Sequence, residues 1–297
     1  MGHDLATEAE LVKLAWALGT TPDGVAFAGS LGRDDIRRLR ERVVAALYDE
    51  HRTAFRRVAA ITRVLPTPLN VRIALRAFSP LLAARVAGEM APDRAAELAN
   101  RMPIEYLAEG CLHLDPRRAA PLISRIHPDR MLAVVVELVG RGEYIALGRL
   151  LDAATDRIVR DAAAAISDEA LLRIGFYAES DAHLTRAVAV LPQQRLRSVV
   201  ACALAGPPDL RSAGLALIAR LEDDRLRGRL AEYAAEADDD TLTRLLRTAT
   251  DNGAVSELLT AVAAMGPQAQ QRVLALPALS EHETLMNLVK TTATHNL

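Results

Sequence analysis

Two residues with metal-binding and redox chemistry lie close together in the chain, Cys111 and His113. A thiolate and an imidazole bind one zinc ion only when both side chains point at it. Residues two positions apart project about 200° apart around a helix, so these two cannot share an ion there. The sequence therefore predicts no metal site. The remaining histidines are isolated and follow no metal-binding spacing; they include His51, His127, His183 and His282.

A glycine-rich loop at residues 29–32 is a second place where chemistry is conceivable, because such loops can hold phosphate at the start of a helix. Asp34 and Asp35 follow directly, and their charge would repel an anion from that helix start. Ser30 lacks the Gly-x-Ser-x-Gly frame that positions a hydrolase nucleophile. We therefore predict a plain turn, no catalytic residue and no cofactor, and the sequence favours a protein that is not an enzyme.

A third candidate is the segment 140–144, Gly-Arg-Gly-Glu-Tyr, which interrupts an otherwise regular helical pattern. Charge, an aromatic ring and backbone freedom occur together here, a combination that suits a ligand or peptide site. The candidate ligand-binding residues are Arg141, Glu143, Tyr144 and Arg149. The alternative, which the pattern favours, is a turn whose glycines end one helix and admit the next.

The elements that hold these residues must come from a chain of globular composition. It has 297 residues, of which 51% are hydrophobic, 25% charged and 3% aromatic, with a net charge of -2. The balance disfavours the broad basic surface of duplex binders, so no nucleic-acid partner is expected. Two cysteines without Cys-x-x-Cys spacing, no signal peptide and no apolar run near 20 residues predict a cytoplasmic protein without a transmembrane segment.

Charge is distributed unevenly along the chain. Residues 33–63 contain nine arginines and five acids, whereas residues 222–251 contain nine acids and five arginines. Opposite charge at the two ends can guide a charged partner or head-to-tail association of copies into a homo-oligomer. The alternative, which we favour, is that these charges lie on the solvated faces of amphipathic helices.

The clearest internal pattern is a repeat led by proline. Successive spacings of 12, 11, 13 and 12 residues separate Pro80, Pro92, Pro103, Pro116 and Pro128. Proline is favoured in the first turn of a helix, where its missing N–H costs nothing, and Ser79 or Asp115 can serve as the preceding cap. We therefore predict that each of these prolines lies in the first turn of a short helix.

Helices of about ten residues are unstable alone in water, so they must stack on their neighbours. Apolar residues at helical spacing, such as Leu98 with Met102 and Leu122 with Ile126, predict one buried stripe per helix. Helices expected near 6–18, 22–30, 34–50 and 52–65 would form an N-terminal cap over residues 1–65. The rest, 66–297, would be a tandem α-solenoid continuous with the cap. We predict an all-α protein with more than about 65% helix and no sheet.

The phrases from Ser79 to Ile126, with paired alanines at the centre and leucine or methionine at the end, resemble the N-terminal cytosolic helical domain of MgtE-type magnesium transporters. The resemblance covers a quarter to a third of the chain and implies a right-handed superhelix of short helices, like that of HEAT repeats. The chain lacks the membrane domain and the β-rich CBS module of that family. Segments such as 115–119 and 168–173 are also similar to uncharacterised bacterial helical-repeat proteins, a likeness that implies no activity.

Three function classes remain open. The leading hypothesis is a binding or scaffold protein that uses the concave face of its helical stack for a protein or peptide partner. The second is a carrier or sensor of an apolar or amphiphilic small ligand, held in a groove lined by Leu, Val and Met. The third, a HEAT-like nucleic-acid enzyme, is disfavoured by the low aromatic content and the negative charge.

Overall fold

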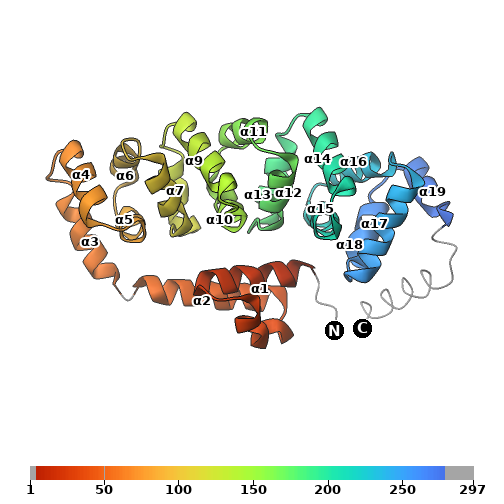
Figure 1. Ribbon diagram of the computed structural model, residues 1–297, viewed down its shortest axis with the longest axis horizontal. Helices are drawn as coiled ribbons and strands as arrows, with labels where there is room; N and C mark the ends of the chain where they lie inside the picture. Colours follow the sequence, from red (N-terminus) through yellow and green to blue (C-terminus); the bar gives the residue numbers. More distant parts are fainter. Residues whose placement is uncertain (1–4, 50, 278–297) are drawn as a thin grey trace. The chain divides into compact units, whose positions relative to one another are not determined.

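The computed structural model describes residues 5–49 and 51–277 of the chain (Figure 1). Helices hold 78% of these residues, and no strand occurs among them. The predictions of an all-α protein and of a helix content above 65% are therefore confirmed for the described ranges. None of the helices in those ranges is both long and apolar enough to cross a membrane.

The N-terminal helices start and end close to the predicted positions. The chain begins with α1 (Leu5–Leu18), the 3₁₀ helix η1 (Pro22–Ser30), α2 (Arg33–Asp49) and α3 (Arg52–Ile61). Local capping and breaking signals were sufficient to locate these elements, although α3 ends four residues earlier than the pattern indicated. The predicted end of the third helix at Glu50 lies outside the described residues.

The prediction for the prolines is confirmed at four of the five positions, and Pro80 is the first residue of α5 (Pro80–Ala87). Pro92, Pro116 and Pro128 are the first residues of α6 (Pro92–Ala99), α8 (Pro116–Ile123) and α9 (Pro128–Gly140). Pro103 instead occupies the N-cap of α7 (Ile104–Leu112), with an extended ψ of 148°. The prediction was wrong there by one position, because a cap residue needs no backbone N–H either and tolerates the proline φ equally well.

The described chain divides into two compact units. The first unit comprises residues 1–36, 167–176 and 180–297, and the second comprises residues 37–166 and 177–179. Helix α2 starts in the first unit and continues into the second. The expected division into a cap over 1–65 and an array over 66–297 stays a prediction.

In the second unit, each short helix packs mainly on the helix two places further along the chain. Contacting pairs are α3 with α5, α5 with α7, α7 with α9 and α9 with α11, and likewise α4 with α6 and α6 with α8. Figure 1 shows these helices next to one another. This packing gives the helices inside the series, such as α5, α6 and α7, a neighbour on both sides, which short helices need for stability. The remaining helices are α4 (Thr67–Ala77), α5 (Pro80–Ala87), α10 (Tyr144–Leu150), η2 (Leu151–Ala153) and α11 (Asp156–Ala165).

The first unit contains longer helices that pack closely. Leu172, Ala203 and Leu210 form a buried cluster between α12, α14 and α15, and α1 packs against both η1 and α15. Several helix starts are capped by side chains, as where the Asp238 carboxylate accepts the N–H of Thr241 at 2.8 Å. The helices of this part are α12 (Asp168–Phe176), α13 (Asp181–Ala189), α14 (Gln193–Ala205), α15 (Pro208–Arg220), α16 (Asp224–Ala235), α17 (Asp239–Asp251), α18 (Val255–Ala263) and α19 (Pro267–Leu274).

Candidate functional site

A groove of about 280 Å³ runs through the second unit and is the candidate site with the most apolar walls described here. We call it the apolar groove. Every helix from α3 to α9 contributes to its walls, which are built almost entirely from aliphatic side chains and methionines. Larger lining residues include Val58, Ile73, Leu98, Leu107, Ile126 and Met131.

Alanines explain why space remains between these helices. Four buried alanines line the groove: Ala84 and Ala95 are central alanines of the proline-led phrases, Ala99 ends α6, and Ala74 lies on α4. A methyl group fills far less volume than the leucine or methionine further along the same helix. The larger side chains set the distance between helices, so the alanines leave a cavity instead of closing the gap.

The polar side chains of the apolar groove are directed to the backbone of its own helices. The Asn70 amide donates to the carbonyls of Thr62 at 2.9 Å and Leu65 at 3.0 Å, which fixes the connection between α3 and α4. The Tyr106 hydroxyl donates to the carbonyl of Phe78 at 3.0 Å. With these donors occupied, a polar guest would lose hydrogen bonds to water without replacing them. The groove is therefore chemically suited to an apolar occupant.

Cys111 lies in the wall of this groove and is not poised for chemistry. Burial raises the pKa of its thiol to about 12, so the thiolate that acts as a nucleophile or metal ligand does not form near neutral pH. Burial likewise lowers the pKa of His113, although Glu109, 3.8 Å away, acts in the opposite direction. Within the described ranges, no group of three histidine, cysteine or acidic residues is placed to hold a metal ion.

The residues predicted as a ligand site contact different partners in the structure. Arg141 caps the end of α9, where its guanidinium contacts Glu137 at 2.8 Å and Glu109 at 3.0 Å. Glu143 and Tyr144 begin α10, and Gly142 before them has a φ of 76°, as expected for a turn that ends a helix. None of these three lines the apolar groove. Their role in binding stays a prediction.

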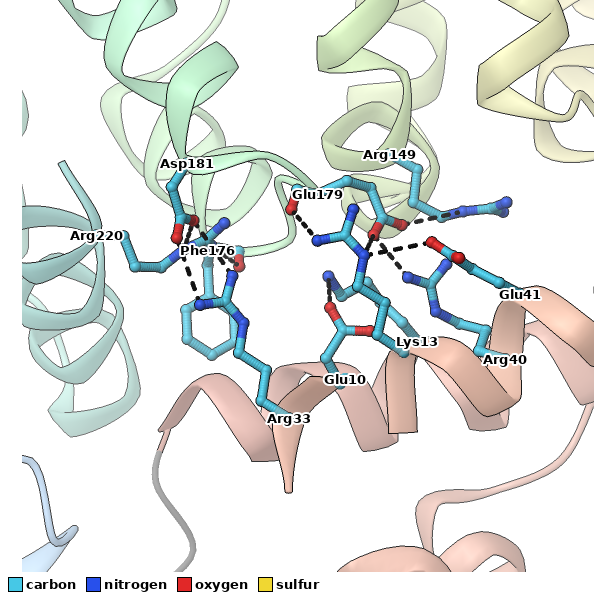
Figure 2. A network of polar contacts seen from close by, with 11 residues as sticks. Glu10, Lys13, Arg33, Arg40, Glu41, Arg149, Phe176, Glu179, Asp181 and Arg220 are labelled. Carbon is cyan, nitrogen blue, oxygen red and sulfur yellow. Dashed lines mark hydrogen bonds and ion pairs between the residues drawn. The ribbon is translucent and has the colours of Figure 1, made fainter. Parts of the chain in front are cut away.

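The fourth predicted residue, Arg149, belongs to a buried charged cluster of the second unit (Figure 2). The Glu179 carboxylate forms ion pairs with Arg40 at 2.6 Å and with Arg149 at 3.6 Å. Arg37 donates a hydrogen bond to the backbone carbonyl of Glu179 at 2.9 Å. The cavity beside it measures about 100 Å³ and is lined by both signs of charge. The Glu179 carboxylate and the guanidinium groups around it offset part of one another's cost of burial. Whether Arg149 also binds a ligand stays a prediction.

A second charged cluster, also drawn in Figure 2, lies in the first unit. Asp181 is 2.7 Å from Arg220 and 3.2 Å from Arg33. Burial acts to raise the pKa of Asp181, but attraction to Arg220 and hydrogen bonds from Arg33 outweigh it, and the pKa is lowered. Lys13 and Glu10 of α1 form a buried ion pair nearby. The space beside them, about 10 Å³, is no larger than one water molecule needs.

The residues of the apolar groove were not among the site residues that the sequence predicted. Its signals were present, namely paired alanines followed by leucine or methionine in each phrase, and they led only to a general expectation of a groove. The predicted site residues instead lie at the end of α9 and in and around α10, because charge and glycine are easier to recognise in a sequence than missing volume.

Comparison with known proteins gives no family assignment: no family model, curated protein or solved structure matches this chain. The resemblance of residues 79–126 to the MgtE N-terminal domain thus stays a prediction.

Proposed function

We propose that this chain is a binding protein and that the apolar groove binds the apolar face of an α-helix from a partner protein or peptide. The observation that supports the proposal is a groove of about 280 Å³ whose walls are aliphatic and whose amide and hydroxyl donors are occupied internally. An amphipathic helix that inserts residues at i, i+3, i+4 and i+7 into such a groove is a recurring mode of peptide recognition.

The exposure of two wall residues favours a helix over a fully enclosed ligand. Ile61 of α3 and Ile73 of α4 line the groove and are still 59% and 37% exposed. A small ligand held inside the groove would leave these two side chains in water and gain no affinity from them. A helix lying along the groove would cover both side chains and bury their apolar surface. The open side of the groove therefore supports a macromolecular partner.

The aliphatic lining supports one further candidate, a carrier or sensor of a small apolar or amphiphilic molecule. The volume of the apolar groove is close to the lower limit of about 300 Å³ for pockets that bind small ligands. Native mass spectrometry of the purified chain separates the two functions. A bound small molecule that is lost when the groove is filled favours the carrier, and its absence together with peptide binding favours the helix receptor.

We propose the α-solenoid for the architecture that presents this groove. Contacts between each helix and the one two places further along, from α3 to α11, support it, because a solenoid consists of units that contact only near neighbours. Free thiols at Cys111 and Cys202 support a reducing, cytoplasmic location.

Filling the groove tests the proposed function. Ala83 and Ala87 are half-buried residues of α5 that line it, so Ala83→Leu with Ala87→Leu should occupy the space that a guest needs. The probe is a labelled amphipathic peptide about five helical turns long, with leucines at i, i+3, i+4 and i+7. We expect the filled variant to bind it at least about tenfold more weakly in fluorescence anisotropy.

The matched control is Ala120→Leu with Ala133→Leu, two half-buried alanines of α8 and α9 that do not line the groove. It should bind the peptide as the unchanged chain does. Equal binding by the filled variant, or no binding by the unchanged chain, would overturn the proposed function.

A further inference from the structure

Helices α3, α4 and α5 contain basic side chains and no acidic ones. Residues 51–88 contain seven arginines and no aspartate or glutamate. Arg52 and Arg56 both form ion pairs with the single carboxylate of Glu89, at 3.1 and 2.9 Å. Four others are exposed and form no ion pair with any side chain that the structure describes: Arg57, Arg63, Arg72 and Arg76.

Helical spacing places two of these arginines beside the apolar groove. Arg57 precedes the groove-lining Ile61 by four residues on α3, and Arg76 follows the groove-lining Ile73 by three residues on α4. Side chains three or four positions apart on a helix are neighbours, with Cβ atoms about 5–6 Å apart. Each of these two exposed isoleucines is therefore flanked by an arginine that forms no ion pair within residues 5–49 and 51–277.

We infer that the helix bound in the apolar groove is acidic, with glutamate or aspartate beside its apolar face. This inference rests on the proposed function and names the chemistry of its partner. An apolar stripe fills the groove, and carboxylates on either side of the stripe accept charge-assisted hydrogen bonds from Arg57 and Arg76. A basic helix with the same stripe meets like charge at the same positions and is rejected.

The shape of the surface favours a helix over an anionic membrane. Groove residues such as Leu98 and Met131 are only 7% and 5% exposed, so a flat lipid surface cannot contact them. A second copy of this chain is disfavoured by a different observation. The acidic residues at 238–240 begin α17, whose leucines Leu242 and Leu246 are buried and offer no apolar stripe.

A pair of designed peptides tests the inference on the full chain. Both carry the same leucine stripe, and the flanking positions are glutamate in one and lysine in the other. At low salt we expect the glutamate peptide to bind at least about tenfold more tightly, and the preference should shrink as salt is raised, since exposed ion pairs are screened.

The variant Arg57→Gln with Arg76→Gln should weaken binding of the glutamate peptide by roughly fivefold to tenfold, and Arg57→Lys with Arg76→Lys should largely restore it. The matched control is Arg225→Gln with Arg229→Gln, two exposed arginines of α16 that remove the same total charge. It should leave the preference unchanged.

The outcomes separate the two levels of the proposal. Equal binding of both peptides, abolished by filling the groove, would overturn the acidic partner and leave the helix-binding function intact. No binding of either peptide would overturn both. Failure of both peptides together with binding to vesicles of phosphatidylcholine and phosphatidylserine, lost in Arg57→Gln with Arg76→Gln, would assign the arginines to a membrane surface instead.

Discussion

The two units use small residues in opposite ways. In the first unit, glycines let helices touch: a Cβ added at Gly228 would lie 2.2 Å from the carbonyl oxygen of Ala264, and one added at Gly175 would lie 2.8 Å from Leu217. In the second unit, a Cβ added at Gly110 would have Pro80, 3.9 Å away, as its nearest neighbour. Small residues close a helix contact where backbones meet, and they open a groove where larger side chains hold the backbones apart.

The largest expected effect concerns leucine truncation in the two regions. Leu184 of the first unit is 2% exposed, and Leu184→Ala should cost about 4 kcal/mol in the free energy of unfolding. Leu98 and Leu122 line the apolar groove, so part of each side chain already faces empty space. Leu98→Ala or Leu122→Ala should therefore cost only about 2 kcal/mol. Urea denaturation followed by circular dichroism measures all three, and equal losses would remove the distinction between the units.

Glycine replacement gives a smaller effect with opposite signs. Gly228→Ala should destabilise the chain by roughly 2–3 kcal/mol, because the new methyl overlaps the backbone of Ala264 and the helices must separate. Gly110→Ala, inside α7 with room around it, should raise stability by up to about 1 kcal/mol through its higher helix propensity. Thermal unfolding measures both changes. Tolerance of Gly228→Ala would contradict the close contact of α16 with α18.

The smallest effect is a pH dependence of stability that comes from Asp181 in the first unit. The pKa of Asp181 is lowered from 3.8 in the folded protein, so its ion pairs with Arg220 and Arg33 stabilise the fold above that pH. This stability is lost as the pH falls through the folded pKa. Asp181→Asn should therefore lower the melting temperature at about pH 6, and the deficit should narrow below about pH 4.

The control for that measurement is Asp161→Asn, which removes one negative charge from the exposed pair with Arg157 in the second unit. Its effect on the melting temperature should be small throughout. A deficit in Asp181→Asn that persists unchanged into acid would show that the carboxylate contributes by packing and not by charge.

Local signals in the sequence determined the helices. Two kinds of helix start depend only on neighbours within one turn. One is the proline that begins α6, α8 and α9, and the other is the Ser79 hydroxyl that accepts the Leu82 N–H at the start of α5. Such interactions can be recognised in one sequence because their partners lie at fixed spacing. Even the error at Pro103 was local, a shift of one residue between two positions that both accept proline.

Only the tertiary structure decided where volume is missing and which charges meet. Arg40 and Glu179 are 139 residues apart, and no pattern in one sequence pairs them. The apolar groove depends on the combined side-chain volumes of helices α3 to α9, and no single phrase contains that sum. Arg149, which the sequence predicted as a site residue because of its charge, forms an ion pair with Glu179. The alanines that open the groove have no functional group that a sequence pattern could identify. Cavities and buried ion pairs are properties of a packed arrangement, so they appear only when the helices are in place.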